Sequence, residues 1–271
     1  VLLRPFGLPE LEDHAAPRSS NGQGLAMGGD FALDDDLAWL LQHADVLFDI
    51  DAEGRLTRVN EPDPEGGPPV VFVARGRRAT LARFRDDVPA EVSSRLGAIA
   101  RELPAWDGGH GDLADYEPLL AAVREWAVNR GDEVSHGPAF RFVDSASAPQ
   151  PARDDLLLVV ASNAHLLDRH FPYTRSVLAS RSPVTGIVRD GAIVSACYCA
   201  RRRPTACEAG VATAEDYRGA GLAVPVVAAW AEAARAAGMT PLYSTTWDNE
   251  ASLRVAAKLG LDAYADTLSL G

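Results

Sequence analysis

The 271-residue chain has little that would place it in a membrane, on nucleic acid or in a disulfide-rich scaffold. No apolar run approaches the roughly 20 residues that a membrane-spanning helix needs. Lysine and arginine number 26 against 38 aspartates and glutamates, a net charge of −12, so the basic face that binds phosphates is lacking. The three cysteines, an odd count with no wider framework, favour a reducing compartment: Cys197, Cys199 and Cys207. We therefore expect a cytoplasmic protein with no nucleic-acid or membrane partner.

Residues 1–30 lack the basic region and long apolar stretch of a signal peptide, and we expect a loosely ordered leader there. The composition is otherwise that of a globular protein, because 47% hydrophobic and 24% charged residues supply enough apolar material for a core.

A proline-bearing polar stretch divides the chain. Residues 144–153 contain mostly small, polar and proline residues between apolar segments, which indicates a linker. Before it, residues 31–143 predict a smaller α/β module: two strand-like runs around Glu53-Gly54, a strand pair within 68–84, helices near 90–103 and 113–129, and a closing strand at 140–143.

Residues 154–271 alternate strands with helices. A hairpin turning at Asp190-Gly191 is followed by a strand ending near residue 213, a long helix over 217–237, a strand near 240–246, a helix over 249–260 and a last strand. This order predicts an α/β layer with at least one parallel strand pair flanking the long helix.

The stretch "DYRGAGLA", residues 216–223, combines an arginine with small residues where the long helix begins. A helix N-terminus presents unpaired N–H groups and the positive end of the macrodipole, and Arg218 adds a permanent charge. The stretch therefore predicts a phosphate-bearing ligand. The alternative is that the small residues only let the helix pack closely on the sheet.

Two motifs in register resemble those of the GNAT superfamily of acyl-CoA N-acyltransferases. Arg218, Gly221 and Ala223 fill the fixed positions of its Q/R-x-x-G-x-G/A motif. Its second signature is matched by five residues: Asn249, Ser252, Lys258, Gly260 and Leu261. The resemblance covers residues 154–271 and implies an α/β fold with a mixed, helix-flanked sheet, preceded here by the N-terminal module.

The resemblance implies an N-acetyltransferase that uses acetyl-CoA as co-substrate, with no metal, and acylates a primary amine of a small molecule by direct attack. The cofactor would lie between the strands "EAGVAT" and "LYSTT", with a backbone N–H near Val211 polarising the thioester carbonyl. The residues that would bind it are Val211, Ala212, Thr213, Arg218, Gly219, Ala220, Gly221, Leu222, Ala223, Asn249 and Ser252.

Two proton-transfer groups follow from the same resemblance. Glu208, on the apolar strand before Val211, is the candidate base with a pKa raised by burial; alternatively it pairs with Arg201 or Arg202. Many family members carry a tyrosine seven residues after the asparagine, where this chain has Ala256. Either Tyr243 or Tyr198 is then the candidate acid, or bulk water protonates the thiolate.

The missing tyrosine also supports a second function, a catalytically weak acyl-CoA sensor or partner-binding module. The acceptor side is short before the hairpin, so we expect acidic or aromatic side chains from residues 1–143 to face the cleft opposite Tyr243 and Glu208. Cys197 and Cys199 are better explained as small buried residues than as metal ligands. The oligomeric state stays open.

Overall fold

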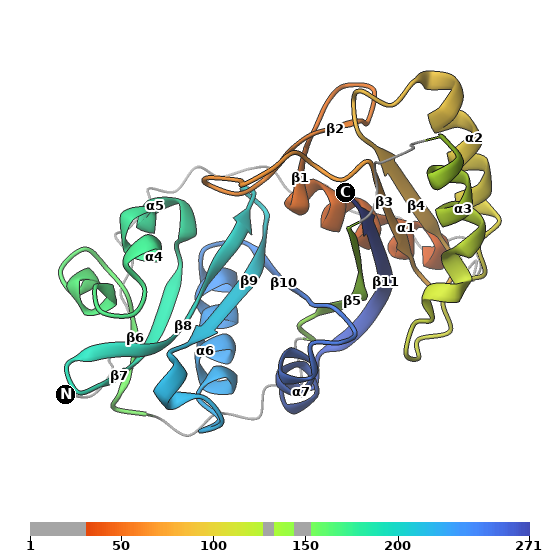
Figure 1. Cartoon of the computed structure of the whole chain (residues 1–271). Coiled ribbons are helices and arrows are strands. Elements are labelled where there is room, and N and C mark those ends of the chain that lie inside the picture. The colour runs from red at the N-terminus through yellow and green to blue at the C-terminus, as the bar shows by residue number, and fades with distance from the viewer. Residues whose placement is uncertain (1–30, 127–132, 144–152) are drawn as a thin grey trace, which may run out of the picture.

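A computed structural model describes residues 31–126, 133–143 and 153–271 (Figure 1). The expected leader and nearly all of the expected linker lie outside these residues. The helices, including three short 3-10 turns, are α1 (Phe31–Leu47), α2 (Ala90–Arg101), η1 (Leu113–Tyr116), α3 (Glu117–Trp126), η2 (Ala164–Leu167), α4 (Pro172–Ser176), α5 (Leu178–Arg181), η3 (Glu215–Tyr217), α6 (Ala223–Ala236) and α7 (Glu250–Leu259). The strands are β1 (Phe48–Ile50), β2 (Leu56–Val59), β3 (Val71–Arg75), β4 (Thr80–Phe84), β5 (Val134–Arg141), β6 (Leu156–Leu158), β7 (Val184–Arg189), β8 (Ala192–Arg202), β9 (Ala206–Thr213), β10 (Thr240–Ser244) and β11 (Asp262–Leu270).

One mixed sheet of nine strands runs through both halves of the chain in the order β4-β3-β11-β5-β10-β9-β8-β7-β6. The pair β9/β10 is parallel and flanks α6, whereas every other neighbouring pair in this sheet is antiparallel. The α/β class and the parallel pair expected from the sequence are confirmed. None of the described helices is long and apolar enough to cross a membrane.

Strand β5 joins the two halves. It precedes the linker in sequence, yet it lies between β10 and β11 and pairs antiparallel with both. The closing strand expected at 140–143 is therefore the end of a longer strand that begins at Val134. Because β5 fills the middle of the sheet, the N-terminal residues are part of the layer that carries the site.

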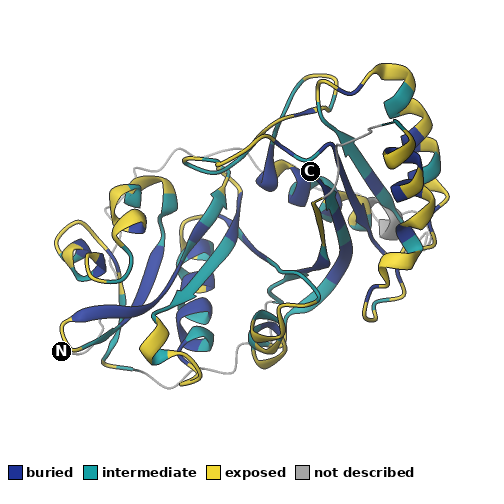
Figure 2. Ribbon diagram, viewed as in Figure 1, coloured by how far each residue is buried: buried dark blue, intermediate teal, exposed yellow. Residues whose placement is uncertain are grey.

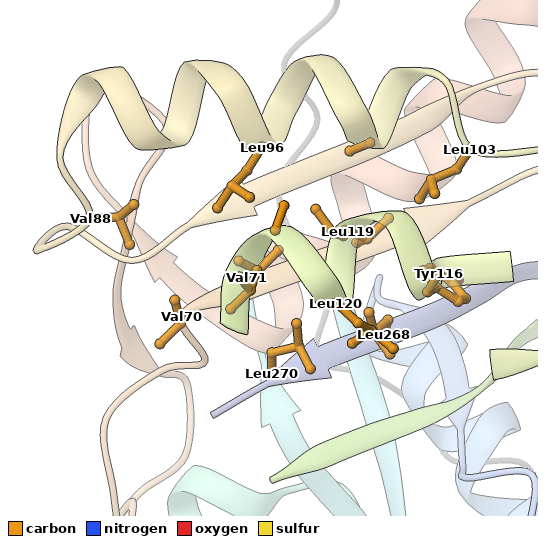
Figure 3. Packing of buried hydrophobic residues seen from close by; sticks show 14 residues of the cluster. Val70, Val71, Val88, Leu96, Leu103, Tyr116, Leu119, Leu120, Leu268 and Leu270 are labelled. Atoms are coloured by element: carbon orange, nitrogen blue, oxygen red, sulfur yellow. The ribbon is translucent and has the colours of Figure 1, made fainter. Parts of the chain in front are cut away.

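The N-terminal side of the sheet is covered on both faces, because successive side chains of a strand point to opposite faces. Val71 of β3 packs with α2, α3 and the end of β11 (Figure 3), and Val73 belongs to the same cluster, whereas Phe72 and Ala74 pack with α1. The strands are largely buried and the outer faces of α2 and α3 are exposed (Figure 2).

On the C-terminal side, α6 covers β7 to β10 (Figure 1). Trp230 is fully buried there. Cys197, Cys199 and Cys207 are free, buried thiols in the same cluster. The expectation that they are small core residues is confirmed.

Two helix boundaries differ from those expected. Of the two strand-like runs predicted around Glu53-Gly54, the first is only three residues long as β1, because α1 continues to Leu47. The long helix begins at Ala223 rather than at 217, because Gly219 and Gly221 have φ of 77° and 73°, outside helical geometry. This start places Pro225 in the first turn, where its missing N–H is tolerated.

Candidate active site

Strands β9 and β10 pair only at their beginnings. Their register runs from Thr240 opposite Ala206 to Leu242 opposite Glu208 and then stops. Beyond this point β9 continues through Thr213, whereas Tyr243 and Ser244 of β10 pair with β5 alone. The two strands therefore diverge from Glu208 onward, and a pocket lies on each side of the opening.

The first of these, called the donor pocket after the role proposed for it below, has a volume of about 500 Å³ and lies between β9, the start of α6 and α7. Ten of the eleven residues predicted to bind the cofactor line it; the exception is Ala220. The ten are Val211, Ala212, Thr213, Arg218, Gly219, Gly221, Leu222, Ala223, Asn249 and Ser252. Tyr243 lines it as well.

The turn before α6 leaves this pocket open. A methyl group on Gly219 or Gly221 would meet no atom within 4 Å, so crowding inside the chain does not explain the two glycines. Their positive φ does, because an L side chain is strained there. Among the residues that the structure describes, no side chain caps the first turn of α6, whose N-cap is Leu222. The turn thus presents free backbone N–H groups, which suits an anion.

Three cations surround the donor pocket: Arg218, Arg254 and Lys258. Arg218 donates from Nε to Thr213 O over 3.3 Å and pairs with no acidic side chain among the residues described. Arg254 pairs with Glu250 at 3.0 Å on the exposed face of α7. The pocket therefore combines free amides with positive charge, the chemistry that a pyrophosphate requires.

The second pocket, called the acceptor pocket after the role proposed for it below, has a volume of about 630 Å³. Both halves of the chain line it, and Glu133, Phe48 and Phe72 come from the N-terminal half. This placement agrees with the expectation that acidic and aromatic side chains before residue 143 face the cleft. It shares Val211, Tyr243, Asn249 and Ser252 with the donor pocket, so the two pockets meet at the strand divergence.

Glu208 sits at the point of divergence, 3% exposed, and is paired. Arg201 Nη1 donates to its Oε2 over 2.6 Å, and the Ser244 hydroxyl donates to its Oε1. The register of β8 shifts between Cys199 and Arg201, and this shift places Arg201 directly opposite Glu208. The arginine-paired alternative is therefore the one observed.

The expected rise in the pKa of Glu208 is wrong. Burial raises this pKa, but Arg201, His43 and the hydrogen bonds from Ser244 and Arg201 outweigh burial and hold it below the ordinary value of 4.5. Arg201 also donates to Glu61 over 2.5 Å. Glu208 is thus an ionised carboxylate that does not itself line the acceptor pocket. Its hydrogen-bond partners Ser244 and Arg201 do line it.

His43 of α1 is a site residue that the sequence analysis missed. Its side chain is 2% exposed and lines the acceptor pocket. Nδ1 lies 2.7 Å from the Tyr264 hydroxyl, and Nε2 lies 4.0 Å from Glu208 Oε1. Burial lowers the pKa of His43 to about 4, an effect that Glu208 opposes and Arg201 supports. The one sequence signal for His43 was its position in an apolar run with helical spacing, and the sequence analysis did not identify that run as a helix.

Tyr243 lies where the two pockets meet. Its hydroxyl is 2.5 Å from Ser252 Oγ, and burial raises its pKa above 10.0. Ala256, at the position where a tyrosine is usual, is buried in the packing of α7 against α6 and carries no proton donor. Tyr198 lies on β8 and lines neither of these two pockets. Within the described ranges, no group of three or more histidine, cysteine or acidic residues could hold a metal.

Residues 184–266 match the family model described as GNAT acetyltransferase. The match runs from the start of β7 into β11 and includes the turn before α6 and both diverging strands. No curated protein sequence matches the chain.

Three solved structures illustrate the chains to which this one is similar. A putative GNAT acetyltransferase from Novosphingobium aromaticivorans is 20% identical over 52% of this chain and 66% of its own, with a TM-score of 0.43. A GCN5-related N-acetyltransferase-like protein from Streptococcus suis is 16% identical over 86% and 99%, with a TM-score of 0.47. A GCN5-related N-acetyltransferase from Kribbella flavida is 14% identical over 90% and 96%, with a TM-score of 0.41. Similarity at this level supports no conclusion about activity.

Proposed function

We propose that this protein, whose residues 184–266 match the GNAT acetyltransferase family model, is an N-acetyltransferase that moves the acetyl group of acetyl-CoA to a primary amine of a small molecule. The observation that carries the proposal is the meeting of two pockets at the divergence of β9 and β10. Such an arrangement lets a donor and an acceptor reach one point from opposite sides, which is the requirement for direct attack.

The donor pocket fits acetyl-CoA. The amides of the turn before α6 and the side chain of Arg218 would hold the pyrophosphate. Main-chain groups from Val211 to Thr213 lie beyond the β9/β10 pairing, so β10 does not occupy their edge of the strand. We assign them to pantetheine, and the N–H near Val211 to polarising the thioester carbonyl.

We propose Glu208 as the proton acceptor, acting through Ser244. The Ser244 hydroxyl lines the acceptor pocket and already donates to Glu208, so a proton taken from the amine at Ser244 has a direct path to the carboxylate. Because the pKa of Glu208 is lowered, this carboxylate is ionised at neutral pH. It is available as an acceptor, although a low pKa makes it a weaker base than the sequence suggested.

We propose Tyr243 as the proton donor to the departing thiolate. It lines both pockets, and its raised pKa keeps the hydroxyl protonated at neutral pH. Ser252, bonded to the same hydroxyl, fixes its direction. The catalytically weak sensor is the second candidate, and the buried Ala256 is the observation in its favour.

The experiment that separates the two candidates measures CoA thiol release from acetyl-CoA with a panel of primary amines, alongside the shift of thermal unfolding that acetyl-CoA produces. Amine-dependent thiol release supports the enzyme. A thermal shift without turnover on any amine supports the sensor, and the absence of both contradicts acyl-CoA binding altogether.

A further inference from the structure

Hydroxyl side chains cover the part of the sheet that forms the floor of the acceptor pocket. Thr267 and Ser269 of β11 and Ser135 of β5 line it, and alternation places each on the same face of its strand. Ser135 is the register partner of Ser269, and Gly137 is that of Thr267. In an α/β sheet such a face is ordinarily apolar, so the polar character of this floor is best explained by a polar ligand that binds to it.

A second row of hydroxyls comes from the end of β10. Ser244, Thr245 and Thr246 line the same pocket. They lie this close to the floor because Gly137 has no side chain: a methyl group there would stand 2.0 Å from the carbonyl oxygen of Thr245. The glycine thus brings the two rows of hydroxyls to face one cavity.

Three of these hydroxyls have no hydrogen-bond partner among the described residues, and three have one. Ser244 donates to Glu208, Thr246 to Asp248 and Thr267 to the carbonyl of Gly137. By contrast, the side chains of Ser135, Ser269 and Thr245 hydrogen-bond nothing within the described ranges, which leaves a donor and an acceptor on each for a ligand.

The charge of the acceptor pocket favours a cation. Of the described residues that line it, Glu133 and Arg201 carry a full charge at neutral pH. Arg201 is paired with both Glu208 and Glu61, whereas the exposed carboxylate of Glu133 forms no ion pair in the described part of the chain. The uncompensated charge is therefore negative.

We infer that the acceptor is an amine on a polyhydroxylated ring, an amino sugar or aminocyclitol. This inference rests on the proposed function. A polyamine would be better matched by several free carboxylates than by one, and an alkylamine would leave the three free hydroxyls desolvated and unpaired. A ring of this class carries the amine, the hydroxyls and the apolar C–H faces that meet the remaining wall, which includes Leu47, Phe48 and Val59.

The test compares glucosamine and 2-deoxystreptamine with cyclohexylamine and spermidine in the thiol-release assay at fixed acetyl-CoA. We expect kcat/KM to be at least tenfold higher for the two hydroxylated amines. The double variant Ser135→Ala/Ser269→Ala should raise KM for glucosamine about tenfold or more, because each lost hydrogen bond is worth roughly three- to tenfold. Glu133→Gln should raise it a few-fold, and this effect should shrink at high salt.

Thr80→Val is the matched control, because Thr80 lies on the edge strand β4 and lines neither pocket. It should leave KM for glucosamine within twofold of the wild-type value. Cyclohexylamine or spermidine serving as well as glucosamine, or an unchanged KM in the double variant, overturns the inference and leaves the acetyltransferase standing. No turnover on any of the four amines overturns the proposed function, and the inference falls with it.

Discussion

His43 should make the stability of the protein depend on pH between about 6.5 and 4. The imidazole is fully buried and its pKa falls from 6.5 to about 4 on folding. The groups that face it are Glu208, Arg201 and Tyr264. A histidine whose pKa is lowered favours the fold when neutral, so its contribution is complete above pH 6.5 and is lost as the pH falls toward 4.

The size of this effect follows from the two pKa values. At pH 5.0 the unfolded imidazole is protonated by roughly 30 to 1, whereas the folded one is mainly neutral, which corresponds to about 2 kcal/mol of lost stability relative to pH 7.5. Glu208 does not act in this window, because a carboxylate with a lowered pKa loses its contribution only below about pH 4.5.

The assay is urea unfolding of the wild type and of His43→Asn at pH 7.5 and 5.0. The asparagine oxygen can still accept a hydrogen bond from the Tyr264 hydroxyl. Any stability lost through the substitution itself cancels, because each protein at pH 5.0 is compared with the same protein at pH 7.5. The wild type should lose about 2 kcal/mol more than the variant between the two pH values. His165→Asn, at an exposed position of η2, is the control and should behave like the wild type. Equal losses in wild type and His43→Asn would refute a buried, neutral His43.

Three further predictions concern the site. Acetyl-CoA at a hundred times its Kd should stabilise the wild type by about 2.7 kcal/mol in thermal unfolding, and Arg218→Glu should abolish the shift while remaining folded; a full shift in the variant would remove Arg218 from the donor site. Tyr243→Phe should lower kcat about 10²-fold with little change in the KM for acetyl-CoA, and an unchanged kcat would exclude it as the acid. Glu208→Gln should lower kcat by about 10² to 10⁴. Because the pKa of Glu208 is lowered, the wild-type rate should show no fall due to Glu208 between pH 6 and 9. Normal turnover in the variant would make Glu208 a structural residue.

The residues that line the pocket proposed for the donor could be grouped from the sequence, because the features that bring them together are local. Arg218, Gly219 and Gly221 lie within four residues of one another, and the backbone conformation that the glycines permit is a property of that turn. Ten of eleven predicted residues consequently line one pocket.

The acceptor half could not be predicted, because it depends on contacts between distant segments. Nothing in the residues near β5 reveals that it enters the sheet between β10 and β11, since strand neighbours are chosen by packing across the whole layer. The surroundings of Glu208 depend in the same way on His43, whose Nε2 lies 4.0 Å from the carboxylate although the two residues are 165 positions apart. His43 lies on a helix whose three consecutive aspartates obscured the apolar pattern.

The most direct test of the account is a crystal structure of the protein with acetyl-CoA. We predict the pyrophosphate on the turn at residues 218–223 and the acetyl group at the junction of the two pockets, between Val211 and Tyr243. A pyrophosphate bound away from Arg218, or an acetyl group that does not reach the divergence of β9 and β10, would contradict it.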